Sequence, residues 1–328
     1  MDKAETVLSI QHLSVEYSSE EGAVKAVRDV SFELERGKTI GLVGETGAGK
    51  TTIALAIMGL LPEPPAKVTS GEILFHGDNV NAMTPKERMK LRGRKLSMIF
   101  QDPMTSLNPI ETVGSQIEEV ILNHHKVSRA EARKMAVEKL EMVGIPGERF
   151  DEYPHQFSGG MKQRIVIAIA QACDPELLIA DEPTTALDVT IQAQILQLIR
   201  QLQAERNTSN IMITHDLGVI AMMCDMVAVV YAGEIIEIGT LADIFECPAH
   251  PYTKGLFKAL PDIHQQEKRR LEPIQGLMPD PTKLTEGCAF APRCAHCTEA
   301  CRKGTVELLN MEGSHSVRCR LFGEGERP

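Results

Sequence analysis

Apolar and polar residues alternate along the first third of the chain at the spacing typical of β-strands. Residues 8–17 and 24–34 show this alternation, and a continuous apolar run at 39–43 predicts a buried strand. A helix is expected from about Lys50 to Leu61, where three closely spaced prolines would end it. Further strands are expected at residues 71–75 and 95–100.

The middle of the chain changes to helical spacing and is followed by a return of strands. Ser128 and Glu131 form a capping box at the start of one predicted helix, and Gly144 supplies its C-terminal stop. Apolar strands are expected at residues 177–180, 210–214 and 226–231, and Ala232-Gly233 predicts a hairpin turn into 234–238. Alternating strands and helices predict an α/β fold, with a mainly parallel sheet covered by helices on both faces.

Composition narrows the class of protein. The 328 residues suffice for about two domains, and 43% hydrophobic with 24% charged residues is an ordinary globular balance. The formal charge of −10 lacks the basic footprint of a phosphate-backbone binder, so no nucleic-acid partner is expected. No apolar run reaches the ~18 residues of a spanning helix, so membrane association is expected through a partner.

The strand at 39–43 leads into a phosphate-binding loop. The segment from Gly44 to Thr51, Gly-Glu-Thr-Gly-Ala-Gly-Lys-Thr, satisfies the P-loop pattern in full. Its glycines allow successive backbone N–H groups to surround phosphate oxygens, and the following helix contributes its positive end. Lys50 is expected to reach the β- and γ-phosphates and Thr51 to ligate Mg²⁺.

Two carboxylates follow the apolar strand at 177–180. Asp181 and Glu182 stand where the C-terminal edge of a parallel sheet binds ligands. Asp181 suits the magnesium shell, and Glu182 suits a general base that polarises the attacking water.

Ser158-Gly-Gly opens another predicted helix with unobstructed backbone amides, which makes a second anion site. One P-loop is enough to hold the phosphates of one nucleotide. The second site therefore indicates contact with the nucleotide of a neighbouring chain.

In this order the P-loop, the Ser-Gly-Gly signature, the Asp-Glu pair and Thr185-Ala-Leu-Asp188 resemble the ATPase subunit of an ABC transporter, over roughly residues 6–260. The resemblance implies a P-loop α/β fold with a nucleotide-binding domain at 1–240. It also implies a helical subdomain at about 102–157. After about residue 241 the chain becomes Pro-rich and irregular, and this composition shift marks a boundary to a small, Cys-rich extension at 241–328.

The same resemblance implies roles for individual residues. Tyr17 would stack on adenine, Gln101 would sense magnesium and the attacking water, and His215 would contact the γ-phosphate. The implied catalytic residues are Lys50, Gln101, Glu182 and His215. The implied ATP and Mg²⁺ contacts are Tyr17, Gly44, Glu45, Thr46, Gly47, Ala48, Gly49, Lys50, Thr51, Thr52, Gln101 and Asp181. Contacts to the nucleotide of the opposing subunit are implied for Ser158, Gly159, Gly160 and Asp188.

Several segments resemble one branch of this family. Residues 101–109, Gln-Asp-Pro-Met-Thr-Ser-Leu-Asn-Pro, look like the segment that dipeptide and oligopeptide importer ATPases carry. Phe157 and Met161 in the signature, residues 250–256 and Leu260-Pro261 are similar to the same branch. Nickel importers carry many of the same sequence segments, so nickel or another solute is the alternative to peptides.

Partners and location follow from the resemblance. It implies a second ATPase subunit, either a paralogue or another copy of this chain, and two membrane permease subunits. An extracytoplasmic solute-binding protein would act indirectly, and the chain would lie peripherally on the cytoplasmic face of the membrane. Two rivals are a soluble ABC-type ATPase and a binding module without turnover. The single cassette and the segment at residues 101–109, which resembles the one in peptide-importer ATPases, oppose the first rival. Intact Glu182 and His215 oppose the second.

Five of the eight cysteines lie in the last 41 residues, at positions 288, 294, 297, 301 and 319. The Cys294-x2-Cys297 spacing favours zinc, with His296 or His315 as further ligands. The extension of peptide-importer ATPases, which this tail resembles, holds a 4Fe–4S cluster. That resemblance selects Cys288, Cys294, Cys301 and Cys319 as ligands and leaves Cys297 without a counterpart. Iron–sulfur, zinc and free thiols all stay open from the sequence.

Overall fold

The computed structural model describes residues 5–20, 22–185, 187–259, 272–284 and 286–323. Its larger sheet has the strand order β11-β12-β10-β9-β3-β8-β7-β6. The five strands from β9 to β6 are parallel, and the three added beyond β9 are antiparallel. The bounds are β3 Thr39–Val43, β6 Leu96–Ile99, β7 Leu177–Asp181, β8 Ser209–Thr214, β9 Met226–Tyr231, β10 Glu234–Thr240, β11 Leu309–Glu312 and β12 His315–Val317.

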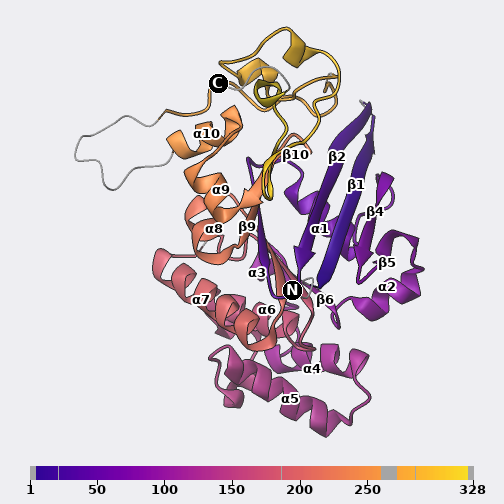
Figure 1. Ribbon diagram of the computed structural model, residues 1–328. Coiled ribbons are helices and arrows are strands. Elements are labelled where there is room, and N and C mark those ends of the chain that lie inside the picture. The colour runs from indigo at the N-terminus through magenta and orange to yellow at the C-terminus, as the bar shows by residue number, and fades with distance from the viewer. Residues whose placement is uncertain (1–4, 21, 186, 260–271, 285, 324–328) are drawn as a thin grey trace, which may run out of the picture.

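A second, antiparallel sheet stands beside the first, in the order β2-β1-β4-β5 (Figure 1). Its strands are β1 Thr6–Ser19, β2 Gly22–Glu35, β4 Ala66–Phe75 and β5 Asp78–Asn79. The alternation at 8–17 and 24–34 correctly predicted β1 and β2, but it could not show that they form a separate sheet. Inward residues such as Leu8, Ile10 and Leu34 pack with helix α1, Lys50–Met58, on one face of the larger sheet.

The other face of the larger sheet is covered by helices. Along β7, Leu177 and Ile179 belong to the core shared with α1, whereas Leu178 and Ala180 pack into the opposite core. A strand buried on both faces reads as a continuous apolar run, as the sequence at 177–180 does. The helices of this opposite layer include α6 Gly159–Ala170, α7 Val189–Arg206 and α8 Leu217–Met223.

The stretch between β6 and α6 consists mainly of helices. It contains α3 Pro103–Ser106, α4 Val113–His124, α5 Arg129–Met142 and the 3₁₀ turns η2 Gly147–Asp151 and η3 Pro154–Gln156. Ser128 and Glu131 form the predicted capping box of α5. Between β5 and β6 lie η1 Val80–Ala82 and α2 Pro85–Leu91.

Helix α1 is shorter than the sequence suggested. It ends at Met58 rather than near Leu61, because Gly59 adopts a left-handed conformation (φ 59°) and its N–H bonds back to the last turn. A glycine in this conformation is a strong helix stop. The prolines that follow therefore lie beyond the helix instead of ending it.

The C-terminal extension is more regular than expected. It contains α9 Leu241–Glu246, α10 Pro251–Lys258, the hairpin of β11 and β12, and three 3₁₀ turns, η4 Ala291–Arg293, η5 Ala300–Arg302 and η6 Arg320–Phe322. Strand β12 pairs with β10 and so continues the larger sheet. The buried carboxylate of Glu237 on β10 accepts hydrogen bonds from the backbone N–H groups of Ala249 and His250 and contacts His315 at 2.9 Å.

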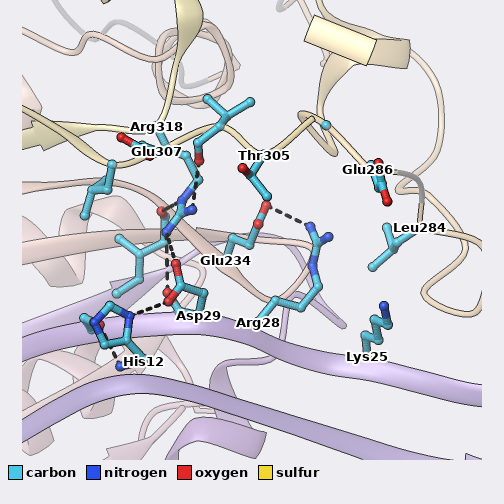
Figure 2. A pocket seen from close by; sticks show the side chains of 15 residues that line it. His12, Lys25, Arg28, Asp29, Glu234, Leu284, Glu286, Thr305, Glu307 and Arg318 are labelled. Carbon is cyan, nitrogen blue, oxygen red and sulfur yellow. Dashed lines mark hydrogen bonds and ion pairs between the residues drawn. The ribbon is translucent and has the colours of Figure 1, made fainter. Parts of the chain in front are cut away.

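A pocket of about 670 Å³ lies where the extension meets β2 and β10 (Figure 2). Its charged walls largely pair with each other: Arg28 lies 2.8 Å from Glu234, and Arg318 lies 3.3 Å from Asp29. The first pair joins the two sheets to each other, and the second joins the extension to β2 of the smaller sheet. Within the described residues, no helix combines the length and the apolar character that crossing a bilayer requires.

Candidate active site

The P-loop connects the carboxyl end of β3 to the start of α1 and approaches its neighbours closely. A Cβ atom at Gly44 would collide with the carbonyl oxygen of Val230, and one at Gly49 with that of Ala26. Gly49 also has φ 103°, a conformation that other residues avoid. Both positions therefore require glycine, which explains this part of the motif.

Lys50 begins α1 and is buried, with 6% of its surface exposed. Its Nζ donates to the carbonyl oxygens of Gly44 at 2.7 Å and Glu45 at 2.9 Å. Burial lowers the pKa of Lys50, and the acids Glu182, Asp181 and Glu45 oppose that shift. The ammonium group is thus held inside the loop that the sequence predicted to bind phosphate.

Asp181 ends β7 and is almost fully buried, with 3% exposed. Burial raises its pKa, against a hydrogen bond from the Thr51 side chain. A carboxylate and a hydroxyl side by side are hard oxygen donors, which Mg²⁺ prefers. One or two protein oxygens suffice for Mg²⁺ when phosphate and water complete its shell, so Thr51 and Asp181 fit this ion.

Glu182 contacts two of the other predicted catalytic side chains, Gln101 and His215, and also Thr185. Its Oε2 accepts hydrogen bonds from Gln101 Nε2 at 2.9 Å and Thr185 Oγ1 at 2.8 Å, and its Oε1 lies 3.2 Å from His215 Nδ1. Burial by itself would raise the pKa of Glu182, but hydrogen bonds from Thr185, His215 and Gln101 outweigh it and lower the pKa. The carboxylate therefore stays ionised at neutral pH.

A cavity of about 220 Å³ opens beside these groups. Its lining includes eight predicted residues: Thr46, Gly47, Gly49, Lys50, Thr51, Thr52, Gln101 and Glu182. Gly44, Glu45, Ala48 and Asp181 belong to the surrounding loop and strand. Tyr17 does not line the cavity. It pairs with Val24, which does.

The four residues expected to act on an opposing subunit lie at two other helix starts. Ser158 is the N-cap of α6, where its Oγ accepts a hydrogen bond from the Met161 N–H, and Asp188 caps α7 in the same way. Gly159 has open space around it, whereas a Cβ at Gly160 would collide with Ile191 of α7. None of these four residues lines the cavity at the P-loop.

The cysteine-rich tail gives weaker evidence for a functional site than the P-loop region does. The Cys288 N–H donates to the Cys301 carbonyl at 2.9 Å, and burial raises the pKa of Cys288 to about 11. His315, one of the candidate zinc ligands, is engaged by Glu237 instead. Across the described part of the chain, no group of three or more His, Cys, Asp or Glu side chains is placed to hold a metal ion. The expected ligand sets for a cluster or for zinc are therefore not assembled.

Some cavity residues were not anticipated from the sequence. Val24, Lys25 and Ala26 of β2 line it from one side, and Met278, Pro279 and Pro281 of the extension line it from another. No local pattern marks these positions, because they come from distant segments of the chain. Two expected features fall outside the described residues: Leu260-Pro261, and Ala186 within the Thr185–Asp188 segment.

A P-loop on a parallel sheet, a buried Asp beside the loop Thr, and a Glu held by Gln and His define a nucleotide-hydrolysing ATP-binding cassette. Two family models match the chain: "ABC transporter" at residues 27–185, and "Oligopeptide/dipeptide transporter, C-terminal region" at residues 236–301. The chain belongs to the family of ATP-binding proteins of oligopeptide and dipeptide ABC transporters.

Curated relatives support this membership over nearly the whole chain. The dipeptide transport ATP-binding protein DppD of Bacillus subtilis is 52% identical over 97% of this chain and 95% of its own length. The oligopeptide transport ATP-binding protein OppD of the same organism is 47% identical, with 98% and 90% covered. DppD of Escherichia coli is 44% identical, with 95% and 96% covered.

Solved structures agree on the fold. The ATP-binding cassette MJ0796, a dimer in a post-hydrolysis state bound to ADP and phosphate, has a TM-score of 0.65 at 28% identity. It covers 71% of this chain and 98% of its own. The cbiO1 protein of Clostridium perfringens, part of the transporter complex cbiONQ, has a TM-score of 0.64 at 29% identity, with 74% and 92% covered. The α/β P-loop cassette predicted from the sequence is confirmed, and the chain is an ATPase of the ABC type.

Proposed function

We propose that this chain is the ATP-hydrolysing subunit that energises a membrane importer of dipeptides and oligopeptides. The observation that carries the proposal is the convergence of Gln101, Glu182 and His215 beside a complete P-loop. The peptide class rests on the relatives, which are named for dipeptide and oligopeptide transport, and on the matched C-terminal region.

Binding of ATP is assigned to the P-loop. Its backbone N–H groups and the Lys50 ammonium group would hold the phosphates, since both are positive and lie within the loop. Thr51 and Asp181 would hold Mg²⁺, which neutralises phosphate charge when bound. Tyr17 would stack on the adenine from the strand next to Val24.

Hydrolysis is assigned to Glu182. Its carboxylate, kept ionised by its neighbours, would orient water and accept its proton. Gln101 and His215 would position that carboxylate and meet the γ-phosphate side of the site. Because phosphoryl transfer needs positioning and charge neutralisation above all, these few groups account for the step.

The second half of each site is assigned to another subunit. Ser158, Gly159, Gly160 and Asp188 are exposed or half-exposed and lie outside the P-loop cavity. In a head-to-tail pair they would face the nucleotide of the opposing chain. We assign the pairing to a paralogue or to a second copy, docked on two permease subunits at the cytoplasmic face and served by an extracytoplasmic solute-binding protein.

The domain division is part of the proposal. Residues 1–240 would form the nucleotide-binding domain, with the helical stretch at about 102–157 docking on the permease, and 241–328 the extension.

A 4Fe–4S cluster on Cys288, Cys294, Cys301 and Cys319 is proposed separately, and no catalytic step uses it. Within the described residues, no three of these thiols are grouped closely enough to hold a metal ion. It is supported by the resemblance of the tail to the extension of peptide-importer ATPases. It is also supported by the placement of Cys319, whose pKa is raised by burial and also by the charges of Cys294 and Cys301, which lie close enough to act on it.

The test is reconstitution. The chain, assembled with its permease subunits in vesicles and supplied with the solute-binding protein, should hydrolyse ATP faster when di- or oligopeptides are added. Lys50→Ala should remove that hydrolysis, because the phosphates lose their buried ammonium group. Stimulation by nickel but not by peptides would replace the peptide assignment with the alternative.

A further inference from the structure

The C-terminal extension reaches into the nucleotide cavity. Met278, Pro279 and Pro281 line the same space as the P-loop. A Cβ placed on Gly47 would come within 3.2 Å of Met278 Cε, so the methionine lies directly against the loop. The Pro281 carbonyl also accepts a hydrogen bond from the Lys25 N–H of β2 at 3.4 Å.

Arg293, also from the extension, ties this segment to the P-loop. Its Nη1 donates to both carboxylate oxygens of Glu45, at 3.1 and 3.0 Å. Its Nε donates to the Gln275 carbonyl at 2.9 Å, and its Nη2 donates to the Ile274 carbonyl at 3.3 Å. Only 6% of the Arg293 side chain is exposed. One buried guanidinium group thus contacts both a P-loop residue and the segment of the extension that leads to Met278.

A second contact fixes the same P-loop residue. The Glu45 N–H donates to the hydroxyl oxygen of Tyr252, at 3.0 Å. Tyr252 lies in α10 and is fully buried against Tyr231 and Phe290. The extension therefore holds Glu45 by both its side chain and its backbone.

The chemistry of the two cavity walls differs. Backbone amides and Lys50 suit phosphate, whereas Met278 and the prolines present an apolar surface with a polarisable sulfur, which suits an aromatic base or a ribose face. The cavity also extends to Val24, beside Tyr17, where the base is assigned.

We propose that Met278 contacts the nucleoside part of bound ATP, and that Arg293 is a positioning residue that sets Met278 and Glu45 relative to each other. The proposal rests on ATP binding at this P-loop. It makes the extension a part of the nucleotide site and not only an appendage to the cassette.

The first experiment compares Met278→Ala with Leu277→Ala in the full chain. Leu277 is the matched control, because it is the adjacent residue, is 91% exposed and does not line the cavity. Titration calorimetry measures the affinities for Mg·ATP and for Mg·tripolyphosphate, which has phosphates but no nucleoside. Met278→Ala should weaken ATP binding about tenfold and leave tripolyphosphate binding unchanged. Leu277→Ala should change neither.

Two outcomes would overturn the assignment of Met278. Wild-type ATP affinity in Met278→Ala would show that the side chain makes no contact with the nucleotide. An equal loss for ATP and tripolyphosphate would show that it acts through the shape of the P-loop instead. In the assembled ATPase, Met278→Ala should raise KM for ATP without lowering kcat, since the contact is the same in ground and transition states.

The second experiment tests Arg293 with Arg293→Lys, which keeps a cation near Glu45 but cannot make the forked contacts to the two carbonyls. ATP affinity should fall, and adding Met278→Ala to this variant should lower it further by less than about twofold. Fully additive losses would separate Arg293 from Met278 and contradict the positioning role. Lys50→Ala serves as the reference. If wild type and Lys50→Ala both failed to bind ATP, the proposed function itself would fail, independently of Met278.

Discussion

The carboxylate of Glu182 is held by side chains from three separate parts of the chain. Gln101 and Thr185 donate to one oxygen, and His215 contacts the other. The Glu182 backbone has φ 47°, a left-handed conformation that costs a non-glycine residue about 1–2 kcal/mol. Its N–H donates to the Ile213 carbonyl at 2.8 Å, which helps to maintain this conformation. The strain is located at the residue to which the chemistry is assigned.

Replacing Glu182 by Gln should keep ATP binding and reduce turnover by about 10²–10⁴-fold, because an amide cannot accept the proton of water. Phosphate release by the assembled ATPase measures turnover, and calorimetry on the chain measures binding. Glu205→Gln is the control, since Glu205 is an exposed acid near the end of α7, outside the stretch assigned to permease docking. Near-wild-type turnover of Glu182→Gln would remove Glu182 from the role of general base.

At this scale the motifs predicted which residues matter but not all of their contacts. Gln101, Glu182 and His215 were expected in one site, and they are in contact. Arg293 was not expected, because its partner Glu45 lies 248 positions away and the pairing depends on tertiary packing. A lone arginine in an irregular tail carries no sequence signal for such a contact.

Among the elements, the strongly apolar or alternating segments were predicted best. Strand β9 was expected at 226–231 and has those bounds, because it is buried on both faces and ends at a left-handed turn of Ala232 and Gly233. The hairpin of β11 and β12 was not anticipated. Its strands are short, and their pairing with β10 is set by long-range contacts rather than by local pattern.

The N-terminus of α10 should make the folded chain sensitive to acid. His250 caps this helix, with Nδ1 accepting from the Tyr252 N–H at 3.0 Å, and burial lowers its pKa to about 3. The unfolded chain takes up the proton near pH 6.5, but the folded chain does not. His250 therefore does not reduce the free energy of unfolding above pH 6.5, but its protonation in the unfolded chain reduces that free energy progressively as the pH falls towards 3.

His250→Asn keeps an oxygen acceptor at the cap but cannot titrate. Between pH 5.5 and 4.5 the wild type should lose about 1.4 kcal/mol more unfolding free energy than this variant. Urea denaturation at several pH values measures the two slopes, and only the slopes matter, since the substitution also changes packing. Parallel curves for the two proteins would show that His250 is protonated in the folded state as readily as in the unfolded one.

The cysteine tail allows a separate test at the level of one segment. If Cys288, Cys294, Cys301 and Cys319 hold a 4Fe–4S cluster, anaerobically purified protein should be brown and contain about four irons and four acid-labile sulfides. Cys288→Ser should bleach it and Cys297→Ser should not. Zinc without labile sulfide, or bleaching by Cys297→Ser alone, would favour the ligand set suggested by spacing.

For the whole molecule, the main consequence of the fold is that the extension and the cassette share a core. Strand β12 continues the larger sheet, and Phe290 packs with Tyr231 and Tyr252 beneath the P-loop. The composition shift near residue 241 did suggest a boundary, but it could not reveal this joint packing. Changes in the extension are therefore expected to affect nucleotide binding, as proposed for Met278 and Arg293.

The Ser-Gly-Gly signature at the start of α6 does not line the P-loop cavity of its own chain. Ser158 is exposed, and the space around Gly159 is open, so the amides at this helix start are accessible to a phosphate from outside the chain. Ser158→Arg would fill this space with a long side chain. It should spare ATP binding by the isolated chain, whose own P-loop is intact. It should reduce hydrolysis by the assembled ATPase at least tenfold, which is about the loss expected when one contact to a phosphate is removed.

Ser158→Arg also removes a helix cap, at a cost of about 1 kcal/mol, so a second cap variant is needed as the control. Thr84→Arg removes the corresponding side-chain cap of α2, which lies outside the stretch assigned to permease docking, and Thr84 is also exposed. It should leave hydrolysis close to that of the wild type, because no nucleotide is assigned to that helix. Calorimetry on the isolated chain and phosphate release by the assembled complex separate the two effects. If Ser158→Arg abolished ATP binding by the isolated chain as well, the signature would serve the nucleotide of its own chain and the two-subunit site would be wrong.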